Sequence, residues 1–160
     1  MEEFIEAVRA LKETKYITTI GKVSEVNGTI CTVTRDNLPP LEDVRLNAIN
    51  SNFDNVFIVY PKVGSEVLCL EIENQPSETC IVKYTEIDKV EIKIKKAEFI
   101  VENGKFTVKN DKANLKQVLS EGFSQLKSVS IITPHGPGSF SPADVSKFTE
   151  LEQKVKQLFA

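Results

Sequence analysis

Hydrophobic and polar positions alternate through much of the first half of the chain, and a period of two is typical of half-buried β-strands. Apolar side chains recur at alternate positions over residues 17–26, 29–35, 66–72 and 79–84. Asn27-Gly28 separates the first two runs and predicts a type I′ hairpin turn, because both central residues of that turn need positive φ. These runs predict a succession of short strands joined by tight turns.

The middle of this region is less regular. Pro39 and Pro40 interrupt the alternation, because a proline cannot donate a hydrogen bond to a strand ladder. A third strand is expected to begin at Val44, and another over residues 56–60. Five or six short strands without an intervening helical pattern predict a small barrel or sandwich. We favour an OB-like five-stranded β-barrel over residues 15–86.

From residue 87 the alternation continues, with lysine and glutamate at the polar positions. The strand that begins near Val90 is expected to continue to Val101, and Asn103-Gly104 predicts a second hairpin turn. Segment 87–109 is too small to build its own core, since an isolated hairpin is marginal in water. Identical strands from neighbouring subunits are the economical partners, which predicts a short intertwined β-prism.

A helical period appears near the two ends of the chain. Residues 1–14 place apolar side chains on one face of a short N-terminal helix. Residues 110–160 predict a C-terminal helical hairpin, with Asn110 or Asp111 as the cap of its first helix. From Ser141 onward, a serine, a proline and an acidic residue occupy the cap, first and third positions of the second helix. The expected fold class is therefore mainly β with α.

Composition and charge narrow the classes of function. The chain has 160 residues and a net charge of −3, which argues against a dedicated nucleic-acid binder, because such proteins usually carry a basic face. Cys31, Cys69 and Cys80 lie inside apolar runs without metal-like spacing, so we expect buried thiols in a reducing compartment. The first residues lack the pattern of a signal peptide, and no apolar run reaches the length of a membrane span. We expect a protein that is made in the cytoplasm and not exported by a cleaved signal.

No stretch carries a recognisable catalytic constellation. His135 is the single histidine, and no Cys, Asp or Glu stands beside it at ligand spacing. It is more consistent with an ordinary loop residue than with a metal ligand repeated around a threefold axis. The chain has no G-x-S-x-G motif, and Gly136-Pro137-Gly138 lacks the lysine of a phosphate loop. We expect no enzymatic activity, no catalytic residues and no cofactor.

Several patterns resemble those of one known family, the central spike proteins of contractile phage tails and related injection systems. Residues 20–33 are similar to the first barrel hairpin of these proteins. Residues 41–46 and the P-x-x-G-x-x-V turn over residues 61–67 are similar to the strands and turn that follow. The loop at 133–138 and the pattern at 148–158 resemble the tails of small baseplate and spike proteins. The resemblance covers most of the chain by pattern, without an invariant motif.

This resemblance implies a homotrimeric central spike or baseplate hub in a virion tail or tail-like particle. Such a spike caps the tail tube, contacts tube or hub proteins, and meets the target membrane only transiently during penetration. The chain departs from the family in two respects, because its prism segment is short and it lacks the His-x-His pair that holds iron in some members. These departures suggest a blunt hub, or a platform for a separate tip protein.

On this interpretation the apolar strand and helix positions form the contacts between subunits. The expected trimer-interface residues are Val90, Ile92, Ile94, Phe99, Val101, Phe106, Val108, Leu115, Leu119, Phe123, Leu126, Phe148, Leu151 and Val155.

A rival interpretation is an OB-fold module that binds single-stranded nucleic acid or a protein partner. Such barrels stack bases on exposed aromatic side chains backed by basic groups. Aromatic residues between positions 16 and 84 are few, and we expect Phe57 and Tyr60 to be buried. We therefore regard nucleic-acid binding as the less favoured function.

Overall fold

The computed structural model describes most of the chain, namely residues 18–47, 54–73 and 75–160. The predicted N-terminal helix over 1–14 lies outside the described residues. The chain divides into two compact units, the first formed by residues 1–50 and 61–87, and the second by residues 51–60 and 88–160. The described residues are mainly β with two helices, which confirms the predicted class at that level.

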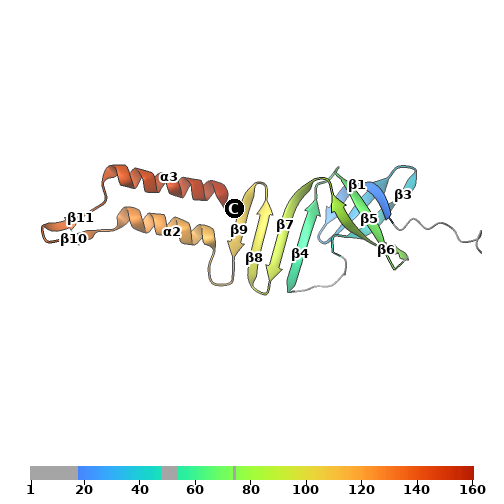
Figure 1. Cartoon of the computed structure of the whole chain (residues 1–160), viewed down its shortest axis with the longest axis horizontal. Helices are drawn as coiled ribbons and strands as arrows, with labels where there is room; N and C mark the ends of the chain where they lie inside the picture. Colours follow the sequence, from blue (N-terminus) through green and yellow to red (C-terminus); the bar gives the residue numbers. More distant parts are fainter. Residues whose placement is uncertain (1–17, 48–53, 74) are drawn as a thin grey trace, which may run out of the picture. The chain divides into compact units, whose positions relative to one another are not determined.

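The first unit contains a closed barrel of five strands, consistent with the predicted OB-like barrel (Figure 1). Around the barrel the strands follow the order β1-β2-β3-β6-β5, and β5 pairs with β1 to close it. The barrel strands are β1 (Thr18–Asn27), β2 (Ile30–Arg35), β3 (Leu38–Arg45), β5 (Glu66–Ile72) and β6 (Gln75–Tyr84).

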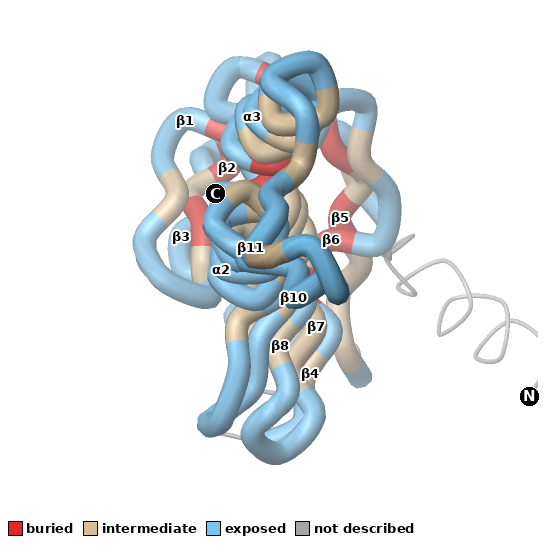
Figure 2. Tube along the Cα trace, turned by 90° about the vertical axis from the view of Figure 1, so that its left-hand side faces the viewer, coloured by how far each residue is buried: buried red, intermediate tan, exposed pale blue. Residues whose placement is uncertain are grey.

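The barrel has a mainly apolar core built from alternate strand positions. Val23, Val33, Val44 and Cys69 are all at most 2% exposed, and the buried segments in Figure 2 gather on the barrel strands. All three cysteines are buried and free, as predicted. Burial raises the pKa of Cys31 to about 12, so this thiol stays protonated at neutral pH.

The two Asn-Gly signals form different turns. Asn103 and Gly104 both have positive φ, 52° and 72°, which confirms the predicted type I′ turn. In the first hairpin, however, Asn27 pairs with Ile30, so the two-residue loop is Gly28-Thr29. Gly28 alone has positive φ there. The predicted turn at Asn27-Gly28 is therefore wrong by one residue.

Strand β3 contains both prolines that were expected to interrupt it. Proline is tolerated where a strand lacks a ladder partner on one side, and among the described residues the pairing of β3 with β6 is at Arg45. The pairing of β2 with β3 is also irregular, with register shifts on both sides of Val33. Arg35 stabilises this segment by donating two hydrogen bonds to the carbonyl oxygen of Pro39, at 2.9 and 2.7 Å.

The second unit contains a four-stranded sheet in the order β4-β7-β8-β9. The strand expected over residues 56–60 forms, but it joins this sheet, because the barrel closes without it. The prediction that one strand continues from Val90 to Val101 is wrong, since the chain turns at Lys95, where φ is 54°. The strands are β4 (Asn55–Pro61), β7 (Ile87–Ile94), β8 (Ala97–Glu102) and β9 (Lys105–Lys109).

Two helices, α2 (Leu115–Ser128) and α3 (Pro142–Leu158), follow the sheet and lie side by side (Figure 1). Ser141 caps α3 as predicted, with its hydroxyl accepting from the backbone N–H of Asp144. The cap of α2 is Asn114, not Asn110 or Asp111. The side chain of Asn110 instead accepts from two backbone N–H groups just ahead of the helix.

The loop between the helices forms a small hairpin that the sequence did not predict. Its strands are β10 (Ile131–Thr133) and β11 (Gly136–Gly138). Thr133 closes the turn by donating its hydroxyl to the carbonyl oxygen of Gly136 at 2.8 Å. Gly136 has a φ of 118°, a conformation that favours glycine.

Candidate functional site

The sheet of the second unit has one apolar face and one charged face. Strand register places Val90, Val101 and Phe106 in one row across β7, β8 and β9. Alternate residues of a strand point to opposite faces, so the next row of the same face is Ile92, Phe99 and Val108. Neither row contains a polar side chain, and both consist of residues predicted for the trimer interface.

This apolar face is only partly covered. None of its predicted contact residues is buried, and Ile94 and Phe99 are 60% and 38% exposed. Val90, Ile92, Val101, Phe106 and Val108 are half-buried. A face of this kind normally packs against another layer of structure.

Strand β4 adds an exposed aromatic ring to the apolar face. Asn55 accepts a hydrogen bond from the backbone N–H of Lys95 at 2.6 Å, and the Tyr60 hydroxyl lies 3.4 Å from Glu91. These two contacts show that β4 is antiparallel to β7. They also place Tyr60 on the same face as Glu91, which is the charged face. By alternation Phe57 belongs to the apolar face, where it is 62% exposed. The prediction that Phe57 is buried is therefore wrong, while Tyr60 is half-buried.

The opposite face is organised around a buried carboxylate. Glu91 is 5% exposed and forms ion pairs with Lys89 and Lys93, each at 2.6 Å. The Lys89 ammonium also lies 4.8 Å from the centre of the Tyr60 ring. Burial opposes ionisation of Glu91, but the two lysine hydrogen bonds outweigh it and lower the pKa. The charge of Glu91 is thus balanced by its two lysine neighbours.

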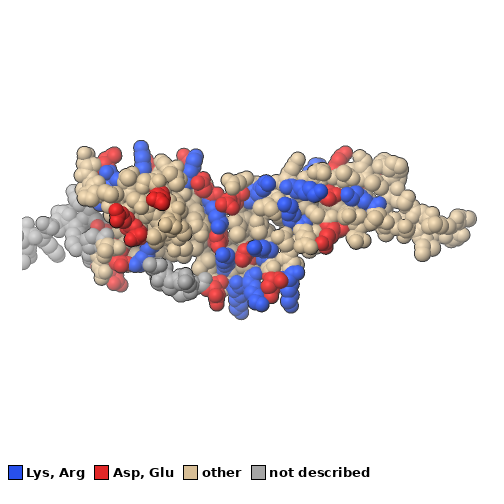
Figure 3. Space-filling view, turned by 180° about the vertical axis from the view of Figure 1, so that it is seen from behind, with Lys and Arg blue, Asp and Glu red and all other residues tan. Residues whose placement is uncertain are grey.

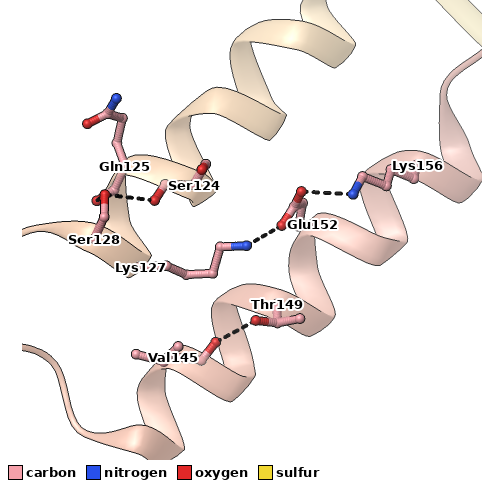
Figure 4. Close-up of polar contacts among 8 residues, drawn as sticks. All are labelled: Ser124, Gln125, Lys127, Ser128, Val145, Thr149, Glu152 and Lys156. Atoms are coloured by element: carbon pink, nitrogen blue, oxygen red, sulfur yellow. Dashed lines mark hydrogen bonds and ion pairs between the residues drawn. The ribbon is translucent and has the colours of Figure 1, made fainter.

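A second ion cluster joins the two helices (Figure 4). Glu152 of α3 binds Lys127 of α2 and also Lys156 of its own helix, the latter at 2.9 Å. Hydrogen bonds from these two lysines lower the pKa of Glu152 to about 2. The cluster links the C-terminal part of α2 to the middle of α3 and so sets their register.

The structure separates the predicted helical contact residues into two groups. Leu119 and Phe123 are half-buried on the side of α2 that also carries Lys127, so they face α3. On α3, Val155 is buried, while Phe148 is half-buried with its ring 5.3 Å from that of Phe140. The exposed group consists of Leu115, Leu126 and Leu151, which are 37–41% exposed.

An open groove of about 410 Å³ connects the sheet to α2. Phe99 and Val108 line it from the sheet, and Leu115 and Val118 line it from the helix. The groove thus joins the apolar face to the exposed side of α2, and the Glu98–Lys109 ion pair is also part of its lining.

The β10–β11 hairpin ends the helical pair with an uncharged surface. Residues 128–143 contain no Asp, Glu, Lys or Arg, and the hairpin region at the right of Figure 3 shows neither red nor blue. Ile132 is 90% exposed there. His135 is exposed in the turn, and the described part of the chain has no group of three or more His, Cys, Asp or Glu residues suited to a metal ion.

The length and apolarity of the helices decide whether either could cross a membrane. Within the residues that the structure covers, neither helix is both long and apolar enough to span a bilayer.

Comparison with protein-family models, with curated proteins and with solved structures gives no match to this chain.

Proposed function

We propose that this protein is a homotrimeric structural subunit of a phage-tail-like baseplate, a central spike or hub that caps the tail tube and aids envelope penetration. The observation that carries the proposal is the partly exposed apolar face of the β4-β7-β8-β9 sheet. The sequence resemblance suggests the kind of particle and a trimer. The apolar face of the sheet gives a physical reason for self-association.

The size of this face determines how much it contributes to an assembly. Four strands spaced about 4.8 Å apart and about 20 Å long present about 400 Å² per chain. In a trimer each face is shared between two neighbours, so the sheets bury about 400 Å² for each pair of chains, against about 1,200–2,000 Å² in a specific two-chain interface. The sheet face therefore supplies part of the contact, and other parts of the chain have to supply the rest.

The proposed role is mechanical. In this proposal, neighbouring subunits complete one another's sheets and helices, which makes the trimer rigid under load. The chain supplies no reaction in this proposal. The barrel serves as the attachment to tube or hub proteins, and the helical hairpin as a blunt tip or a platform for a separate tip protein.

The described barrel offers little support for the rival function. Within its described residues Tyr84 is the single aromatic side chain, and burial raises its pKa, so its ring is partly enclosed. Binding of single strands by stacking needs exposed rings on the barrel. The observation favours the structural role.

The deciding measurement is the solution mass of the purified chain, by light scattering over a tenfold concentration range. We expect a trimer whose mass does not change on dilution. A monomer throughout that range would contradict the proposal, and titration with labelled single strands at two salt concentrations would then test the OB-fold alternative.

A further inference from the structure

After α3 ends at Leu158, the chain returns to the sheet of the second unit, and its last residues lie beside β9 (Figure 1). Phe159 has an extended backbone, with φ −108° and ψ 143°, and pairs with Phe106 of β9 in a parallel bridge. The backbone N–H of Ala160 then donates to the carbonyl oxygen of Phe106 at 2.9 Å. Phe159 and Ala160 therefore begin a further strand along the outer edge of β9. We call these two residues the β9 latch.

The latch contains the most buried side chain of the helical region. Among residues 110–160, all of which the structure describes, Val155 and Phe159 are the buried ones, at 9% and 8% exposed. Residues paired side by side on neighbouring strands share a face of the sheet, so Phe159 extends the apolar row that contains Phe106. Burial in this region is thus concentrated where α3 meets β9.

A second attachment joins the helical pair to the other end of β9. Lys109 and Asn114 form an antiparallel bridge. Beside it, the backbone N–H of Asn110 donates to the carbonyl oxygen of Ala113 at 2.9 Å. The chain that enters α2 and the chain that leaves α3 are therefore both fixed to one strand, at its two ends.

The open groove beside these attachments shows how little else holds the helices to the sheet. Leu115 and Val118 line the groove from α2, and they are 37% and 53% exposed. A helix that packed closely on the sheet would bury such side chains. The position of the helical pair against the sheet therefore depends mainly on its two attachments to β9. Without the latch, the attachment at residues 109–114 remains, and the pair is free to turn about it.

The latch also occupies a main-chain group of an edge strand. In the described sheet β9 is the last strand in the order β4-β7-β8-β9, so its side away from β8 is an edge. Unpaired N–H and C=O groups on an edge strand are a template for pairing with another chain. The latch supplies the carbonyl oxygen of Phe106 with a donor from its own chain and so closes this part of the edge.

We infer that the β9 latch is a conformational device of the second unit, with a closed and an open state. In the closed state Phe159 and Ala160 fix the end of α3 to β9. In the open state the helical pair turns about residues 109–114, and the edge of β9 at Phe106 is available for a strand of another chain. The contacts of the latch lie inside one chain, so this inference does not depend on the proposed function.

The latch should open before the rest of the unit unfolds. It is held by an isolated bridge and by one buried ring, whereas β8 and β9 pair from Glu98 to Glu102 without a break. Regions with few contacts open at a lower free energy than the core of a domain. Amide hydrogens in the last turn of α3 should therefore exchange with solvent faster than those in the middle of β8.

The first test removes the hydrogen bond of the latch and keeps its ring. Ala160→Pro deletes the N–H that donates to Phe106, and Phe159 already has the extended backbone that a residue before proline prefers. The matched control is Ala160→Ser, which keeps the N–H. Hydrogen–deuterium exchange in the last turn of α3 should be roughly five- to tenfold faster in Ala160→Pro, as expected for one lost hydrogen bond. Equal exchange in the two variants would overturn the latch.

The second test removes the ring. Phe159→Ser should speed up exchange in the last turn of α3 roughly a hundredfold, because the loss of a buried aromatic side chain costs more than one hydrogen bond. The matched control is Leu158→Ser, since Leu158 is the preceding residue and is 49% exposed. Exchange in the barrel should stay the same in both variants, which shows that the chain is folded. A Phe159→Ser protein that exchanged like Leu158→Ser would refute the latch.

Trypsin cleavage tests whether the helical pair turns when the latch opens. Lys112 is exposed and lies between the bridged residues Lys109 and Asn114. Release of the latch should make this segment more mobile, so cleavage after Lys112 should be roughly tenfold faster in Ala160→Pro and Phe159→Ser than in their controls. Faster exchange in α3 without faster cleavage after Lys112 would show that the inferred turning of the helical pair is wrong.

Discussion

The barrel and the second unit both alternate apolar and polar residues along their strands, but only the barrel covers its apolar side. Thirteen described residues of the first unit are buried. In the second unit four described residues are buried, namely Ile58, Glu91, Val155 and Phe159. A closed barrel turns its apolar face inward, whereas an open sheet with helices beyond one edge leaves that face available.

This difference teaches that burial, not pattern, separates a self-sufficient unit from one that needs a partner. Val33 and Ile92 have similar chemistry and similar strand positions, yet one is 0% exposed and the other is half-buried on an open face. Substitutions at the two sites should therefore act on different equilibria. Those in the barrel should change folding, and those in the sheet should change association.

The largest effect is expected at the centre of the barrel. Val33→Asp buries an unpaired carboxylate, which costs several kcal/mol against a typical total stability of about 5–15 kcal/mol. The barrel should unfold, and its thiols should react with a disulfide reagent that leaves the wild-type chain unlabelled. Thr34→Asp, at the exposed neighbouring position, should keep the thiols protected. Protected thiols in Val33→Asp would refute the account of the core.

The corresponding change in the sheet should break the assembly and spare the barrel. Ile92→Asp places a carboxylate in the middle of the apolar face, so light scattering should report monomers while the thiols stay protected. The control is Lys105→Asp, which puts the same group at an exposed position on the charged face. An Ile92→Asp protein that stayed fully assembled would disprove the role of this face.

A pair of glycines gives a smaller contrast between the units. A Cβ atom at Gly21 would lie 2.5 Å from the carbonyl oxygen of Thr34 and 2.5 Å from Val33, inside the barrel wall. Gly21→Ala should therefore lower the free energy of unfolding by about 1–3 kcal/mol. At Gly138 the nearest atom is 3.6 Å away, so Gly138→Ala should be nearly neutral. Denaturant titration checks both, and equal midpoints would argue against the close approach at Gly21.

The smallest effect is expected when low pH weakens the ion cluster between α2 and α3. The folded-state pKa of Glu152, about 2, lies below its ordinary value of 4.5. The stabilisation from its lysine partners is thus present above about pH 4.5 and is lost as pH falls towards 2. Glu152→Gln should remove this part of the acid sensitivity of the helices. Carboxyl titration by NMR measures the pKa directly, and a value near 4.5 would contradict the ion cluster.

Features that depend on local sequence could be predicted. The Asn103-Gly104 turn and the Ser141 cap both follow from a few neighbouring residues. The buried cysteines follow from the apolar runs around them. These predictions needed no knowledge of which segments pair across the fold.

Features that depend on a choice between competing partners could not be predicted from the sequence. The pattern at residues 56–60 predicts a strand, but whether it joins β5 or β7 depends on how the barrel closes. Asn110 and Asn114 are equally good caps by residue type, and the chain uses the side chain of Asn110 for a turn instead.

The position of β4 in the chain has a consequence for synthesis. β4 ends at Pro61, but its partner β7 is not complete until Ile94, after two barrel strands have been made. At roughly 5–20 residues per second, translation of the intervening 33 residues takes roughly 2–7 s. During that interval an apolar strand that includes Phe57 emerges from the ribosome without its partner. In the nascent chain, β4 therefore stays unpaired until β7 has been made.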